Sequence, residues 1–92
     1  MIQSFKDAWT KEFYESGSGR RWASIRAAGQ RKLDQIESSN SLDDLRTPPG
    51  NRLEALKGDR SGQHSIRIND QYRVCFVWKN DGAHEVEIVD YH

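Results

Sequence analysis

The end of the chain combines side chains that can move a proton. Asp90, Tyr91 and His92 place a carboxylate, a phenol and an imidazole next to one another. An imidazole titrates near neutral pH, so His92 can act as an acid or a proton shuttle. In a regular strand Asp90 shares a face with His92 and can orient its ring or act as a base, whereas Tyr91 points away. Such a charged strand end is otherwise ordinary solvated surface, so both interpretations stand at this level.

Two long cations fall in segments that read as strands. Arg73 lies within Tyr72–Trp78, and Lys57 belongs to Leu53–Lys57. A long cation within a strand must face either solvent or an anion. Both residues are therefore candidates for phosphate binding and for stabilising negative charge in a transition state.

These candidates need a sheet to position them. Tyr72–Trp78 is rich in β-branched and aromatic residues, which favours a buried strand. Asn80-Asp81-Gly82 supplies turn residues, and the alternating Glu85–Tyr91 returns as the partner strand. Leu53–Lys57 and His64–Ile68 are predicted as two more strands, joined by Gly58–Gly62, and Met1–Phe5 as an edge strand.

Helices are predicted between the first strand and the others. Asp7 is a good N-cap for a helix that ends at Gly17, and apolar spacing from Arg21 to about Ser38 follows one face of a second helix. Thr47–Gly50 contains two prolines and must be a loop. The predicted fold is α+β: an antiparallel two-helix hairpin packed on a mainly antiparallel, four- to five-stranded sheet. Trp9, Trp22 and Trp78 are predicted to pack in its core, and His64 is expected to be a hydrogen-bonded structural residue.

Length and composition set the class of protein. The chain has 92 residues, 35% hydrophobic and 30% charged, which predicts one domain spanning residues 1–92. It contains no apolar run near the ~20 residues that cross a bilayer and opens without a signal-peptide pattern. A single cysteine, Cys75, cannot form an internal disulfide. We therefore expect a cytoplasmic protein. The net charge of zero does not indicate nucleic acid, although basic residues gather between Arg46 and Lys79.

Four segments of this sequence together resemble a known family. They are Leu53–Arg60, His64–Asn69, Tyr72–Trp78 and Val89–His92. They are similar to the HigB branch of the RelE superfamily of bacterial toxins, most nearly its GraT-type members. The resemblance implies a RelE-like fold, similar to small microbial ribonucleases, and a toxin that cuts ribosome-bound mRNA. It also implies that Lys57, Arg73, Asp90, Tyr91 and His92 form the active site.

The chemistry implied is metal-independent RNA cleavage without a cofactor. The 2′-hydroxyl attacks the adjacent phosphate, which requires a base, an acid for the leaving oxygen and cations for the phosphorane charge. Family members often carry a histidine where this chain has Glu54. Glu54 can serve as the general base beside His92, or it can be a bystander that pairs with Arg52 or Arg73.

The resemblance also implies partners. A cognate antitoxin, expected to be a helix-turn-helix DNA-binding protein, would neutralise the toxin and carry it to operator DNA. The 70S ribosome and its mRNA would be the target, and no membrane is involved. Two alternatives stand beside this hypothesis: a ParE-like toxin that acts on DNA gyrase without nuclease activity, and a catalytically inactive module that only binds the antitoxin.

Overall fold

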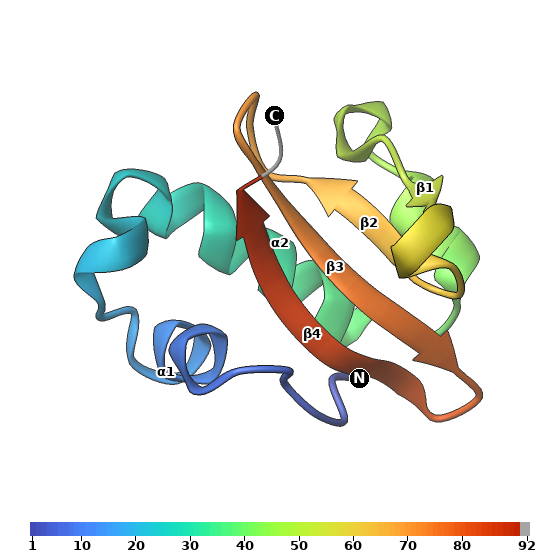
Figure 1. Cartoon of the computed structure of the whole chain (residues 1–92), viewed down its shortest axis with the longest axis horizontal. Coiled ribbons are helices and arrows are strands. Elements are labelled where there is room, and N and C mark those ends of the chain that lie inside the picture. Colours follow the sequence, from blue (N-terminus) through green and yellow to red (C-terminus); the bar gives the residue numbers. More distant parts are fainter. Residues whose placement is uncertain (91–92) are drawn as a thin grey trace.

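Four antiparallel strands form a sheet in the order β1-β2-β3-β4 (Figure 1). The structure is a computed structural model that describes residues 1–90. The strands are β1 (Glu54–Ala55), β2 (His64–Arg67), β3 (Tyr72–Lys79) and β4 (Gly82–Asp90). The helices are α1 (Ala8–Ser16) and α2 (Arg26–Ser38), with short 3₁₀ segments η1 (Arg20–Ile25), η2 (Leu42–Arg46), η3 (Pro49–Asn51) and η4 (Gly58–Arg60).

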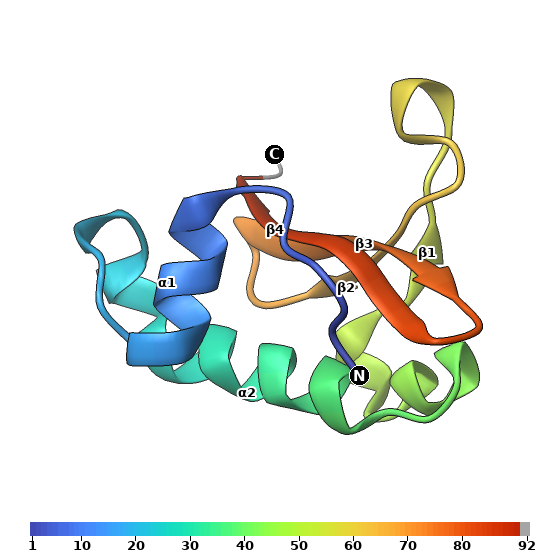
Figure 2. The ribbon, with the colours of Figure 1, turned by 90° about the horizontal axis from the view of Figure 1, so that it is seen from below.

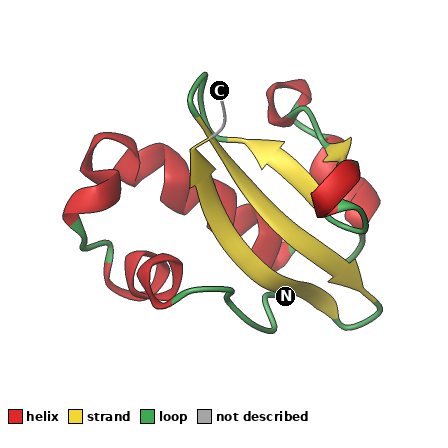
Figure 3. Ribbon diagram, viewed as in Figure 1, coloured by secondary structure: helices red, strands yellow, loops and turns green. Residues whose placement is uncertain are grey.

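The helices cover one side of this sheet. Figure 2 shows α2 running along that side and α1 beside β4. Between them lies the core, whose largest fully buried side chains include Phe13, Leu33, Ile36, Ile66 and Phe76. Figure 3 distinguishes the helices from the strands in the view of Figure 1. The predicted α+β class, with two helices on an antiparallel sheet, is confirmed.

The first helix begins and ends as the sequence predicts. The Asp7 carboxylate accepts a hydrogen bond from the Thr10 backbone N–H at 2.7 Å, which satisfies one of the free donors of the first turn. Gly17 adopts a left-handed conformation, with φ 69°, and closes the last turn through its N–H to the Phe13 carbonyl.

The second predicted helix is wrong at its start. The chain forms the 3₁₀ segment η1 first, and α2 begins only at Arg26. Trp22 and Ile25 are both buried, and a 3₁₀ turn places residues three apart on the same side. Gly29 of α2 then lies against the Phe13 ring, which a Cβ would approach to 3.0 Å. The helices meet there and cross, α1 being nearly end-on in Figure 1, where the sequence predicted an antiparallel hairpin.

The two predicted outer strands are shorter than expected. Met1–Phe5 forms two isolated parallel bridges to β4, Ile2 with Ala83 and Phe5 with Val86. Strand β1 contains only Glu54 and Ala55, so Lys57 lies outside it. After β1 the Leu56 N–H donates to the Gln63 carbonyl at 2.9 Å, and the chain between these residues turns at Gly58, whose φ is 65°. We call residues 56–63 the arm; it rises from the side of the sheet opposite α2 (Figure 2).

One aromatic prediction is wrong and another is incomplete. Trp9 is 59% exposed rather than in the core, and the Arg21 guanidinium lies over its ring, 4.9 Å from the centroid. The apolar spacing of α1 places Phe13 inward and leaves Trp9 at the edge of that face. His64 stacks on Phe76, but its buried Nδ1 has no hydrogen-bond partner among residues 1–90, contrary to the expectation.

Candidate active site

One face of the sheet carries polar and charged side chains instead of the core. Side chains alternate between the two faces of a strand, and partners in register share a face. The register pairs Glu54 with Ser65, Ser65 with Cys75 and Cys75 with Glu87, and it pairs Arg67 with Arg73. We call the surface formed by these residues the open face. The opposite face carries the core side chains Ile66, Val74, Phe76 and Ile88.

Arg73 is fixed at the centre of the open face. Its Nε donates to the Ser65 hydroxyl at 2.8 Å, and one terminal nitrogen donates to the Arg52 carbonyl at 2.7 Å. Ser65 is fully buried beneath it. These two contacts orient the guanidinium on the open face, and an arginine held in this way suits the binding of a phosphate.

Two other candidates come from β1 and the chain that follows it. Glu54 lies opposite Ser65, whose hydroxyl accepts the hydrogen bond from Arg73. Ser65 therefore lies between Glu54 and Arg73 across the sheet. Lys57 stands at the base of the arm, exposed and in extended conformation, with φ −124° and ψ 177°. The sequence predicted it within a strand, whereas the structure places it in the chain just after β1.

Asp90 lies on the other face. It pairs with Tyr72, and both therefore share the face of Ile88 and Val74. A small hollow there is lined by Arg21, Trp22, Tyr72, Ile88 and Asp90. Its carboxylate accepts a hydrogen bond from the Gln71 amide at 3.1 Å. Asp90 thus lies at the end of the sheet, away from the Arg73 side. Tyr91 and His92 lie outside the described residues, and their catalytic roles stay predictions.

The structure adds charged residues that the sequence analysis did not select. Glu87 forms ion pairs with Arg60 of the arm and with Lys6 of the N-terminal segment. Together with Arg73 these groups surround Cys75. Burial raises the pKa of the Cys75 thiol, while the positive charges of Arg60, Arg73 and Lys6 oppose that rise. The alternation of β4 places Glu87 on the open face, but no local pattern predicts which cations reach it.

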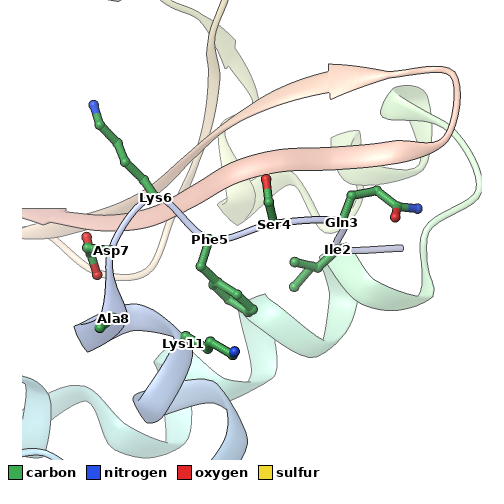
Figure 4. Close-up of a pocket in the computed structure, with 8 residues that line it drawn as sticks. All are labelled: Ile2, Gln3, Ser4, Phe5, Lys6, Asp7, Ala8 and Lys11. Atoms are coloured by element: carbon green, nitrogen blue, oxygen red, sulfur yellow. The ribbon is translucent and has the colours of Figure 1, made fainter.

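Another hollow lies apart from the open face. It is lined by residues 2–8 and Lys11, between the N-terminal segment and α1 (Figure 4). It contains none of the predicted catalytic residues. Within residues 1–90 there is also no group of three or more His, Cys, Asp or Glu side chains that could hold a metal ion, and no helix long and apolar enough to span a membrane.

Comparison with known sequences connects this geometry to a family. The profile of the family described as "RelE-like toxin of type II toxin-antitoxin system HigB" matches residues 3–92. The chain is 45% identical to "Toxin HigB-1" of Vibrio cholerae over 80 residues, covering 85% of this chain and 84% of that protein. It is 32% identical to "Endoribonuclease HigB" of Proteus vulgaris over 94 residues, covering all of both proteins.

Solved structures share the fold at low sequence identity. The structure described as "YoeB-YefM complex from Staphylococcus aureus" contains a chain that matches with a TM-score of 0.61 and 16% identity, covering 100% of this chain and 98% of that one. The YoeB dimer from the same organism gives 0.59 and 19%, covering 99% and 94%. At these identities the likeness concerns the fold alone.

Proposed function

The chain belongs to the HigB family of RelE-like toxins of type II toxin–antitoxin systems, and we propose that it cuts mRNA on the ribosome without a metal ion, acting as a single toxin domain in the cytoplasm. The name of the Proteus vulgaris relative, "Endoribonuclease HigB", supports an endoribonuclease activity. Cleavage of translated mRNA would stop translation and growth.

The position of Arg73 supports this proposal most. Its guanidinium lies on the open face, oriented by the Ser65 hydroxyl and the Arg52 carbonyl. In cleavage by a 2′-hydroxyl, negative charge grows on the oxygens of the phosphorane. A pre-oriented cation at that point lowers the barrier, because it needs no reorganisation during the reaction.

The other candidate residues have roles that follow from their chemistry. Glu54 is the proposed base for the 2′-hydroxyl, since it lies one residue from Arg73 across the sheet. Lys57 would add positive charge from the base of the arm. His92 is the proposed acid for the leaving 5′-oxygen, with Tyr91 and Asp90 beside it. Because Asp90 faces away from Arg73, its proposed part is to orient His92 at the sheet end rather than to contact the phosphate.

A toxin of this family acts together with a cognate antitoxin. We propose that this antitoxin is a helix-turn-helix protein and that the complex reaches operator DNA only through it. The ribosome and its mRNA are the proposed target. Docking on ribosomal RNA would use backbone phosphates and would weaken as salt rises.

Primer extension on a defined mRNA in a reconstituted translation system tests the proposal. The wild type should cut only translated message. Arg73→Ala and His92→Gln should each lower the cleavage rate by ~10²-fold, because one removes charge stabilisation and the other an acid. Circular dichroism of each variant checks that the fold is kept.

The other outcomes separate the alternatives. Cuts on RNA without ribosomes would make the protein a free ribonuclease. The absence of cuts by wild-type protein that still arrests growth would favour a ParE-like target instead. Wild-type cleavage rates in both Arg73→Ala and His92→Gln would contradict the catalytic roles proposed for these two residues.

A further inference from the structure

Glu87 joins three separate parts of the chain on the open face. Its Oε2 lies 3.1 Å from a terminal nitrogen of Arg60 and 3.3 Å from Nζ of Lys6. Arg60 comes from the arm, on the β1 side, and Lys6 from the segment that runs along the outer edge of β4. Figure 4 shows Lys6 pointing to the opposite side of this segment from Phe5 and Lys11. Two cations from opposite edges of the sheet therefore meet on one carboxylate.

The anion of this cluster is more deeply buried than its two cations. The Glu87 side chain is 13% exposed, whereas those of Arg60 and Lys6 are 33% and 48% exposed. The anion is thus at the bottom and the cations remain accessible from solvent. An anion that approaches the open face therefore meets these two cations before it meets Glu87.

Lys6 and Arg60, which we call the cation pair, also lie close to Arg73. Cys75 pairs with Glu87 across the sheet, and Arg73 is two residues before Cys75 on the same face. Two residues along a strand cover ~6.6 Å, and neighbouring strands lie ~4.8 Å apart. An extended RNA strand placed over Arg73 would therefore bring its next phosphates within reach of the cation pair, Lys6 and Arg60.

We propose that Lys6 and Arg60, joined through Glu87, form a second phosphate-binding position on the open face, which takes an RNA phosphodiester flanking the one that is cleaved. This inference rests on the proposed function, because it assumes that the open face receives an RNA strand. Such a contact contributes affinity independent of sequence. Glu87 is its positioning residue, since it keeps the arm and the N-terminal segment at the right distance.

Salt-dependent binding tests this position without requiring cleavage. Binding of a short, labelled 2′-O-methyl RNA, which cannot be cut, is followed by fluorescence anisotropy over a range of salt concentrations. Each phosphate contact on a single strand contributes a slope of ~0.7 to the plot of log affinity against log salt. Lys6→Ala and Arg60→Ala should each lower that slope by about 0.7.

Control variants separate phosphate binding from a structural role. Lys11→Ala removes an exposed lysine from the opposite side of the same region and should keep the wild-type slope. Lys6→Arg and Arg60→Lys retain the charge and should restore the slope. A variant that only loosened the fold would not be rescued in this way, and urea unfolding checks each variant for stability.

The possible failures are distinct. Wild-type slopes for both Lys6→Ala and Arg60→Ala, or no RNA binding by the wild type at low salt, would overturn the second phosphate position. A wild type that binds RNA with the expected slopes but cuts no translated mRNA would overturn the proposed function and leave the phosphate position standing.

Discussion

Arg73 and Asp90 show how neighbouring candidates can end on different faces of a sheet. Both belong to paired strands, yet Arg73 pairs with Val89 and Asp90 with Tyr72, one residue further along. Since the side-chain period of a strand is two, this single step moves a side chain from one face to the other. Asp90 therefore lies at the end of the sheet on the face opposite Arg73, and of these two residues the contact with phosphate is proposed for Arg73 alone.

Cys75 gives a prediction at the same scale. The thiol is fully buried, and burial raises its pKa above the usual 9.0. The folded protein therefore holds this proton more tightly than the unfolded chain does. Its contribution to stability should be complete below pH ~9 and be lost as pH rises through the raised pKa. The free energy of unfolding of Cys75→Ala, measured from pH 8 to 11, should fall less steeply than that of the wild type.

Reactivity provides an independent check on that thiol. Iodoacetamide at pH 8 should modify Cys75 much more slowly in the native protein than in urea, because the thiolate is scarce and covered. Equal rates in both conditions would contradict its burial beneath Arg60 and Arg73.

Among the elements, the N-terminal segment depends on one glycine at the start of β4. Gly82 has φ 128°, which side chains rarely adopt, and an added Cβ would run into the Met1 carbonyl oxygen. That carbonyl accepts the Ala83 N–H at 2.8 Å. The close approach explains why residues 1–5 can pair with β4, and it places Lys6 near Glu87.

Gly82→Ala should therefore destabilise the protein by about 2 kcal/mol or more, because both the backbone conformation and the contact with Met1 are disturbed. Urea unfolding measures the change. Gly50→Ala is the matched control, since nothing lies within 4 Å of its added Cβ, and its effect should stay within about 0.5 kcal/mol. Similar losses in both variants would argue against the Met1 contact.

At the scale of the whole molecule, toxicity and antitoxin binding should separate. Expression of the wild type should arrest growth, and co-expression of the antitoxin should relieve the arrest. Arg73→Ala should not arrest growth although it still binds the antitoxin, since it loses one cation and leaves the core intact. Growth curves with co-purification of the antitoxin measure both properties. An equally abundant Arg73→Ala protein that still arrests growth would favour the gyrase-directed or other non-nuclease alternatives.

The sequence alone predicted the elements with strong local signals. Strands β2 and β3, the β3–β4 turn, and the caps Asp7 and Gly17 follow from side-chain alternation, turn residues and helix-cap chemistry. The family was also predicted, because its motifs are short, contiguous segments. Weak local signals led to errors. Strand β1 was predicted too long, and the kink at Trp22 within η1 was missed because Trp22 and Ile25 fit an α-helical spacing as well as a 3₁₀ turn.

Only the tertiary structure decided which side chains meet. The contacts of Glu87 with Lys6 and Arg60 join residues 81 and 27 positions apart in the sequence, as the differences 87 − 6 and 87 − 60 show. They require Arg60 of the arm and Lys6 of the N-terminal segment to reach the same face of the sheet. The bulge at Glu85, with φ 51°, sets the register that brings Glu87 opposite Cys75. Local residue patterns determine how each segment folds, but the register between segments determines which charges share a face.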